Sequence, residues 1–211
     1  MNSRRTSRIP SHKRPFDLTL LALAHLFPPL LVMWILLWAA IPLIIWLDDR
    51  GSIFFRQTRV GKDGKPFTVL KFRTMVGNAQ DLGPGWTGDD DSRVTRVGRI
   101  LRRTALDELP QILSIWKGEM SLVGPRALPV EMHADYVGEE PRFALRLNGL
   151  PGLAGMSQLY LPRHCDPTKR LGYDLLYLEK SGLLLDIRIV LMAVWLTLSG
   201  GWGRGSRRPE A

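Results

Sequence analysis

The stretch from Leu18 to Leu47 contains no Lys, Arg, Asp or Glu, and the pair Pro28-Pro29 interrupts it near its first third. As one straight helix it would be roughly 45 Å long, whereas the hydrocarbon core of a bilayer is about 30 Å thick. Adjacent prolines remove backbone donors and clash with the preceding turn, so we expect the segment to bend or split there. The sequence therefore predicts a membrane segment that is broken at Pro28 and Pro29.

Basic residues flank this segment on both sides, and basic residues favour the cytoplasmic side of a membrane. A helical hairpin that enters the bilayer and returns satisfies both flanks, whereas a tilted single crossing satisfies only one. We predict the re-entrant hairpin and keep the single crossing and a buried helix of a soluble protein as alternatives. The flanking basic residues are Arg4, Arg5, Arg8, Lys13 and Arg14 before the segment, and Arg50, Arg56, Arg59 and Lys62 after it.

The composition limits the classes of partner and the cellular compartment that fit this chain. The net charge of +9 over 211 residues implies an anionic partner, which is a lipid headgroup, a nucleic acid or a phosphorylated substrate. The single Cys165 excludes an internal disulfide and fits a reducing compartment. The apolar run is too long for a secretory signal and lacks a small-residue cleavage site. No Cys/His cluster has the spacing of a zinc site.

The chain divides by composition into four parts. We expect a basic N-terminal segment over residues 1–17, a re-entrant membrane helix over 18–47, a compact cytoplasmic domain with membrane-surface helices over 48–199, and a flexible basic tail over 200–211. The expected fold is mainly α with one small β-hairpin.

The β-hairpin is predicted by two apolar runs, Ile53–Val60 and Phe67–Met75, on either side of an Asp-Gly turn. Alternation in the second run places four side chains on one face of the strand. Two of the four are cations, which indicates either a solvated strand edge or an anion site built on a rigid element. These side chains are Phe67, Val69, Lys71 and Arg73.

Two further segments have a recognisable pattern. Residues 77–92, with Asp89, Asp90 and Asp91, read as a solvated loop because the spacing lacks the alternation of a calcium loop. The run Leu183–Leu198 carries charges and is too short in its uncharged part to span, so it is a core helix or an interfacial one.

Arginines recur at every third position just before a pair of acidic residues, with apolar residues offset by one. On a helix this places a cationic stripe beside an apolar one, as in a segment that lies on anionic lipid. A soluble amphipathic helix with an exposed basic face is the alternative. The arginines are Arg93, Arg96, Arg99 and Arg102, and the apolar residues are Val94, Val97 and Ile100.

The pair Asp107-Glu108 opens the next helical pattern, for which we expect Thr104 to be the N-cap. Free N–H groups and nearby arginines at a helix N-terminus should lower a carboxyl pKa, so that the group is ionised at neutral pH. An ionised carboxylate can attack phosphorus to form an acyl phosphate, and a neighbouring carboxylate can hold Mg²⁺. By itself, such a pair is common on helix surfaces and is a weak indication of catalysis.

Four motifs in order make a stronger case. They are Lys13-Arg14-Pro15-Phe16-Asp17, Lys71-Phe72-Arg73-Thr74-Met75, Leu106-Asp107-Glu108-Leu109-Pro110-Gln111 and Ser121-Leu122-Val123-Gly124-Pro125-Arg126. Together they resemble the bacterial sugar transferase family, the small monotopic phosphoglycosyl transferases that act on polyprenyl phosphate. The resemblance covers residues 12–198, nearly the whole chain.

The resemblance implies a re-entrant helix broken at proline, a catalytic domain on the cytoplasmic face of the bacterial inner membrane, and Mg²⁺ dependence. It implies transfer of a sugar 1-phosphate from a UDP-sugar to undecaprenyl phosphate, with UMP released, as the first membrane step of a surface glycan pathway. By analogy Asp107 is the nucleophile that forms a phosphosugar-enzyme intermediate, and Glu108 binds Mg²⁺. Further positions match substrate-contacting positions of the family or lie beside them: Lys71, Arg73, Arg102, Arg126 and, more loosely, Asp174.

The chain departs from the family pattern in three places. Phe27-Pro28-Pro29 lacks the serine that usually precedes the helix-breaking proline, so the help of its hydroxyl with freed carbonyls is missing. Ala127 replaces the second proline of Pro-Arg-Pro, which affects how the nucleotide is positioned. Met156 replaces an aromatic residue, so the sugar preference is expected to differ.

Two other classes of function stay open on the sequence. The charge and the arginine stripe also fit a membrane-anchored nucleic-acid-binding protein, but the tryptophans lie mostly in apolar contexts rather than among cations. The same helices fit a scaffold without catalysis. We therefore expect a UDP-sugar, polyprenyl phosphate and anionic lipid as partners, and no nucleic acid. The sugar, the pathway and whether the chain forms a homodimer are left undetermined.

Overall fold

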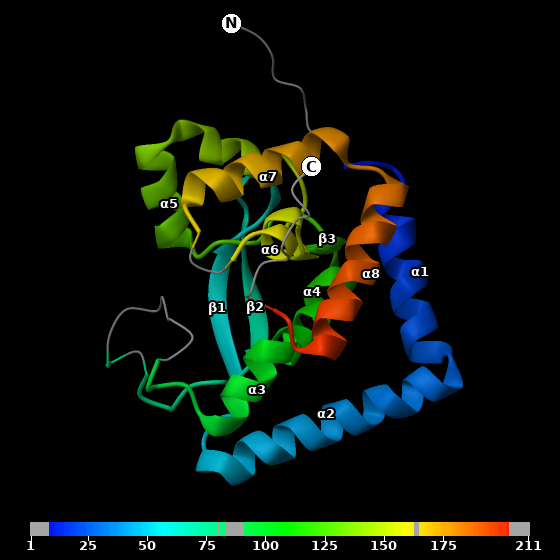
Figure 1. The fold of residues 1–211 in the computed structure, drawn as a ribbon, viewed down its shortest axis with the longest axis vertical. Coiled ribbons are helices and arrows are strands. Elements are labelled where there is room, and N and C mark those ends of the chain that lie inside the picture. The colour runs from blue at the N-terminus through cyan, green and yellow to red at the C-terminus, as the bar shows by residue number, and fades with distance from the viewer. Residues whose placement is uncertain (1–8, 80, 83–90, 163–164, 203–211) are drawn as a thin grey trace, which may run out of the picture.

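The computed structural model describes residues 9–79, 81–82, 91–162 and 165–202. Helices surround two small sheets, which agrees with the prediction of a mainly α fold (Figure 1). Three parts of the predictions lie outside the described residues: residues 1–8 of the basic N-terminal segment with Arg4, Arg5 and Arg8, Asp89 and Asp90 of the acidic loop, and most of the basic tail. The α-helices are α1 (Lys13–Leu26), α2 (Pro28–Asp49), α3 (Arg96–Thr104), α4 (Ile112–Lys117), α5 (Val130–Glu139), α6 (Met156–Tyr160), α7 (Pro167–Lys180) and α8 (Leu183–Ser199). Three short 3-10 helices are η1 (Lys62–Gly64), η2 (Leu106–Gln111) and η3 (Pro141–Asn148).

The predicted break at the proline pair is confirmed. Helix α1 ends at Leu26, and the extended backbone of Phe27 (φ −72°, ψ 116°) separates it from α2, where Pro28 occupies the first turn. Proline is tolerated there because the N–H it lacks would have no partner in the helix. Helix α2 has a mean hydropathy of 2.6 and only 11% of its most apolar window is buried, so by length and composition it could cross a membrane.

Both ends of the helical pair are attached to the rest of the protein. At the start of α1, Lys13 forms an ion pair with Asp186 of α8 (Nζ to Oδ2, 3.0 Å) and donates to the carbonyl of Val123. At the end of α2, Asp49 pairs with Arg73. The start of α1 and the end of α2 are therefore both held by the rest of the chain, with α1 beside α8 and α2 running past α3 (Figure 1).

The predicted β-hairpin is also confirmed. Strands β1 (Phe54–Val60) and β2 (Pro66–Phe72) pair antiparallel around η1, where Asp63 and Gly64 have positive φ. Strand β2 ends at Phe72, earlier than the predicted Met75, so Arg73 lies beyond the ladder. Phe67 and Val69 are buried on the face that the alternation predicted.

A second sheet joins distant parts of the chain. Strands β3 (Ser121–Val123) and β4 (Gly152–Ala154) pair in parallel, and Arg126 forms an isolated bridge with Gly152 just beyond them. Gly124 lies so close to the residues before β4 that a Cβ on it would meet the carbonyl oxygen of Leu150 at 2.3 Å. This approach holds the segment that carries Arg126 against the segment after η3.

Helix α3 differs from the prediction in its caps. Its N-cap is Thr95, whose hydroxyl accepts from the Gly98 N–H, while Thr104 lies in the last turn and donates back to the carbonyls of Ile100 and Leu101. The expectation that Thr104 caps the next helix is therefore wrong. The chain reverses at Ala105, which adopts a left-handed conformation (φ 55°), and η2 follows directly.

Helix α8 is a core helix on one side, and the alternative of an interfacial helix stays a prediction. One side packs into the core through Ile189 and Asp186, whereas the other exposes large apolar side chains. The exposed fractions of Leu184, Trp195 and Leu198 are 83%, 69% and 80%. Helix α3 contacts both α8 and α2, so the two helices with exposed apolar sides pack against the same helix.

Candidate active site

The acidic pair lies in the first turn of η2, immediately after the reversal at Ala105. Asp107 and Glu108 are each only 9% exposed, although both are carboxylates. Burying an ionised carboxylate is unfavourable unless cations or hydrogen-bond donors surround it. The residues around the pair therefore decide its chemistry.

Glu108 is paired with two cations from different parts of the chain. Its Oε1 accepts from Lys71 Nζ of β2 (2.6 Å) and from Arg126 Nη2 (2.5 Å), and its Oε2 accepts from Arg126 Nη1 (3.2 Å). Burial alone would raise the pKa of Glu108, but the charges and hydrogen bonds of Arg126 and Lys71 hold that pKa well below its usual value. Glu108 is therefore ionised in the folded protein.

Asp107 behaves in the opposite way. Burial raises the pKa of Asp107 above its usual value, and the charge of Glu108 adds to the rise, while Lys71, Arg102 and Arg126 oppose it. The expectation of a lowered pKa at the helix N-terminus is thus right for Glu108 and wrong for Asp107. The physical reason is that Asp107 is buried without a cation bonded directly to it among the described residues.

The cations of the cluster are themselves affected by burial. Burial lowers the pKa of Lys71 to about 8, against the opposing charge of Glu108. Burial also lowers the pKa of Arg59 on β1 to about 10, helped by the charge of Arg126. Arg102 of α3 donates from Nε to the Thr74 hydroxyl at 2.9 Å and acts on Asp107 electrostatically. Two carboxylates thus face a group of four cations, a composition suited to binding phosphate.

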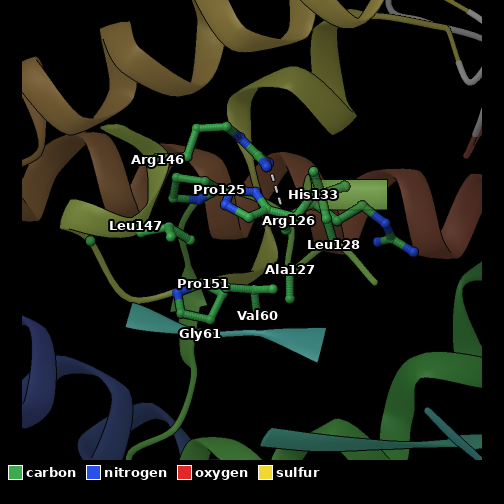
Figure 2. A pocket seen from close by; sticks show the side chains of 11 residues that line it. Val60, Gly61, Pro125, Arg126, Ala127, Leu128, His133, Arg146, Leu147 and Pro151 are labelled. Carbon is green, nitrogen blue, oxygen red and sulfur yellow. Dashed lines mark hydrogen bonds between the residues drawn. The ribbon is translucent and has the colours of Figure 1, made fainter. Parts of the chain in front are cut away.

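A pocket adjoins this cluster on the side of the Arg126 backbone (Figure 2). Its cavity volume is about 10 Å³, which is room for about one water molecule. Arg126 and Arg146 both line it, and Arg146 Nη2 donates to the Arg126 carbonyl at 2.8 Å. The lining residues are Val60, Gly61, Pro125, Arg126, Ala127, Leu128, His133, Arg146, Leu147, Gly149 and Pro151.

The comparison with known proteins decides the family. The family described as bacterial sugar transferase matches residues 9–200. The chain belongs to the bacterial sugar transferase family. It is 42% identical over 191 residues to the UDP-glucose:undecaprenyl-phosphate glucose-1-phosphate transferase of Caulobacter vibrioides, covering 86% of this chain and 68% of that protein.

Other members of the family differ in length. The chain is 37% identical over 202 residues to the exopolysaccharide production protein PSS of Rhizobium leguminosarum, covering 90% of this chain and 97% of that protein. It is 34% identical over 192 residues to the UDP-N-acetylgalactosamine-undecaprenyl-phosphate N-acetylgalactosaminephosphotransferase of Aeromonas hydrophila, covering 89% of this chain and 44% of that protein. These relatives carry transferase or exopolysaccharide names, so the resemblance stated from the motifs is confirmed.

The structure of this sugar transferase gathers some of the residues predicted from sequence and leaves others apart. Lys71, Asp107, Glu108 and Arg126 are in mutual contact or under mutual electrostatic influence, together with Arg102. Arg73 instead binds Asp49 and the carbonyls of Ser52 and Met75, so it joins the end of α2 to the domain. A role for Arg73 in binding substrate stays a prediction.

Asp174 is also separate from the acidic pair, but it is connected to it. It is buried on α7, where it accepts from Arg146 Nε at 2.7 Å and from the Ser157 hydroxyl at 2.8 Å. Arg146 in turn holds the carbonyl of Arg126. Asp174 therefore positions the backbone of a cluster residue, and direct contact with the donor stays a prediction.

Arg59 was missed as a site residue because the sequence showed it only as one of several flanking positive charges. The signal that identifies it is the strand register, in which Arg59 pairs with Phe67 on the face that also carries Lys71. Arg59 Nη1 donates to the carbonyl of Ala127 at 2.8 Å, which brings it beside Arg126.

The carboxylates of the site could hold Mg²⁺ in only one way. Among the described residues no group of three or more His, Cys, Asp or Glu side chains is placed to hold a metal ion, and Glu108 is already paired with two cations. Mg²⁺ is commonly held by one or two carboxylates together with substrate phosphates and water. Glu108 fits that arrangement as a single carboxylate ligand, in which the ion binds together with a phosphorylated substrate.

Proposed function

We propose that this chain transfers a sugar 1-phosphate from a UDP-sugar to undecaprenyl phosphate and releases UMP, at the start of a polysaccharide pathway. The names of the similar transferases support the class of donor and acceptor. The observation that carries the proposal is the buried pair Asp107-Glu108 among Lys71, Arg102, Arg126 and Arg59. A nucleic-acid-binding or scaffold function does not call for two buried carboxylates in a phosphate-binding surrounding.

The first step is nucleophilic attack by Asp107. A carboxylate oxygen of Asp107 forms a bond to the sugar-proximal phosphorus, and the bond from that phosphorus to the bridging oxygen of the diphosphate breaks. The electron pair leaves with UMP, and the sugar phosphate stays on Asp107 as an acyl phosphate. Asp107 serves better than Glu108 for this step because Glu108 is held by Lys71 and Arg126.

The second step returns the enzyme to its starting state. A phosphate oxygen of the polyprenyl acceptor attacks the same phosphorus, and the bond to Asp107 breaks. The products are the polyprenyl diphosphate sugar and the free carboxylate. One small site can thus serve a soluble donor and a membrane-bound acceptor in turn.

The cations of the cluster bind and orient the phosphates. When the donor is absent, Lys71 and Arg126 neutralise Glu108. When the diphosphate enters, we expect their N–H groups to turn to its oxygens, because charge-assisted bonds to phosphate are of similar strength. Bound Mg²⁺, held by Glu108, would neutralise charge on the diphosphate.

The placement of the site also fits a monotopic arrangement. Lys13 and Asp49 attach the outer ends of α1 and α2 to the same domain, which favours a hairpin that enters the membrane from the cytoplasmic face and returns. The exposed apolar sides of α2 and α8 would then lie against lipid. In that arrangement the cluster would lie near the headgroups, beside the acceptor phosphate.

The test of the activity is UMP release from a panel of UDP-sugars with polyprenyl phosphate and Mg²⁺, together with intact-mass detection of the phosphosugar adduct. Asp107→Asn should abolish both signals, because an amide is a poor nucleophile. Glu108→Gln should weaken the dependence on Mg²⁺ while the adduct still maps to Asp107. Full activity of the Asp107→Asn variant would refute the assigned nucleophile, and an unchanged Mg²⁺ titration in Glu108→Gln would refute the metal ligand.

The test of the topology is labelling of single cysteines in a Cys165→Ser background. Ser11 and Asp48 are exposed on the two sides of the helical pair. Ser11→Cys and Asp48→Cys should both be protected from an impermeant maleimide in intact spheroplasts and react in inside-out vesicles. Labelling of one position from the periplasm and of the other from the cytoplasm would show a true crossing.

A further inference from the structure

Helix α3 begins against the segment that follows β2. The carbonyl of Thr74 accepts from the Thr95 N–H at 3.1 Å, and a Cβ on Gly98 would meet the same carbonyl oxygen at 2.0 Å. Only glycine therefore fits at position 98, and the first turn of α3 lies directly on the backbone of Thr74. Figure 1 shows α3 beside the end of the β-hairpin.

The face of α3 that lies on Thr74 also carries Arg102. Side chains four positions apart lie one above the other on a helix, so Arg102 follows Gly98 on this face. The Arg102 Nε–H donates to Thr74 Oγ1 at 2.9 Å, and Thr74 is only 7% exposed. The structure thus separates Arg102 from the arginines of α3 that are exposed, which are Arg96, Arg99 and Arg103.

Arg102 lies within electrostatic reach of the proposed nucleophile. Helix α3 contacts η2, which carries Asp107. Burial raises the pKa of Asp107, and the charge of Arg102 is among those that oppose this rise. An arginine side chain has several rotatable bonds, so a hydrogen bond to its Nε restricts where the guanidinium plane lies. The Thr74 hydroxyl provides such a bond.

One short segment of the chain thus sets the positions of two cations beside the acidic pair. Lys71 of β2 binds Glu108 directly at 2.6 Å, and Thr74, three residues later, holds Arg102. A positive charge that is already fixed in place stabilises the charge of a transition state without reorganisation, which a mobile side chain does not. The hydroxyl of Thr74 therefore has a consequence for the reaction although it carries no charge.

We infer that Thr74 is a positioning residue, whose hydroxyl holds the guanidinium of Arg102 toward the phosphoryl group that Asp107 receives. The inference rests on the proposed function and adds a residue that acts through Arg102 rather than by contact with the substrate. Loss of the hydroxyl should slow the transfer step more than it weakens donor binding, because Arg102 would act on charge in the transition state.

The experiment measures how fast the phosphosugar adduct forms on Asp107 in a single turnover at several UDP-sugar concentrations. Thr74→Val keeps the shape of the side chain and removes the hydroxyl, so the maximal rate should fall about tenfold while the half-saturating donor concentration changes little. Thr74→Ser keeps the hydroxyl and should recover most of the rate. Thr68→Val, at an exposed position of β2, is the matched control and should leave both quantities unchanged. Thermal unfolding checks that the variants are folded, and Thr74→Ala takes the place of Thr74→Val if valine is not tolerated.

A double-mutant cycle separates positioning from a general effect on the fold. Arg102→Lys keeps a positive charge but has a methylene in the place of Nε, so Thr74→Val should add less than about a twofold loss of rate in that background. Following the adduct by intact mass over hours keeps slow variants measurable. A tenfold loss that persists in Arg102→Lys would overturn the inference, because Thr74 would then act independently of Arg102. An unchanged rate in Thr74→Val, or no recovery in Thr74→Ser, would overturn it as well.

Failure of the proposed function gives a different result. Absence of UMP release and of the adduct on Asp107 in the wild type would refute the function itself. Normal activity of the wild type together with normal activity of Thr74→Val would refute only the role of Thr74.

Discussion

Replacing Lys71 by arginine should change how activity depends on pH. Lys71 is buried at the centre of the cluster, with its Nζ 2.6 Å from Glu108 Oε1. Burial lowers the pKa of Lys71 from 10.5 to about 8, and the charge of Glu108 only partly opposes this. The group is therefore cationic below about pH 8 and loses its charge above it. One pH unit above that value, about a tenth of Lys71 is still charged.

The expected profile of kcat/KM therefore falls about tenfold per pH unit above pH 8 in the wild type. The fall in kcat should begin at a higher pH than the fall in kcat/KM, because the donor phosphates favour the charged form of Lys71 in the complex. In Lys71→Arg the guanidinium does not titrate in this range. The alkaline fall in kcat/KM should then shift to the pKa of Arg59, which burial lowers to about 10.

The assay is UMP release at limiting UDP-sugar between about pH 6 and pH 10. Lys65→Arg is the matched control, because Lys65 lies exposed in the hairpin turn. Arginine does not reproduce the geometry of lysine, so the absolute rate of Lys71→Arg will differ, and the position of the limb is the quantity to compare. If the limb of Lys71→Arg stayed near pH 8, Lys71 would not be the titrating group and the reasoning would be wrong. At acidic pH, activity should fall as Asp107 becomes protonated, at a pH above the ordinary carboxyl value because burial raises its pKa.

Two further predictions concern the attachment of α1 to the domain and the contact of α8 with lipid. Asp186→Asn leaves the buried Lys13 without its ion-pair partner and should lower the free energy of unfolding by about 3–5 kcal/mol in denaturant titrations. Glu140→Gln, at an exposed ion pair, is the control and should change it far less, and equal effects would contradict a structural role for Asp186. Trp195, 69% exposed on α8, should be quenched by brominated lipids, so Trp195→Phe should remove more of the total quenching than Trp202→Phe, in which a partly buried tryptophan is replaced. Equal losses would show that the apolar side of α8 does not face lipid.

Local rules account for the features that were predicted correctly. The break at Phe27 follows from the proline pair, and the β-hairpin follows from alternation around an Asp-Gly turn. Each depends on residues that are close together in the sequence. The cap at Thr104 failed for the same kind of reason, because a capping pattern also fits the last turn of the preceding helix, and the positive φ of Ala105 that ends that helix has no clear sequence signal.

The amino-acid sequence alone determined the long apolar segment, its break, the order of the motifs and the presence of an acidic pair followed by an arginine motif. Only the tertiary structure decided which charges meet: Glu108 is paired with cations 37 and 18 positions away, and β1 brings Arg59 to the same place. It also decided the sign of the pKa shift at Asp107, because burial and the distances between charges depend on the packing of β2, η2 and the segment after β3. Electrostatic energy depends on distance and surroundings in three dimensions, and spacing along the chain does not contain that information.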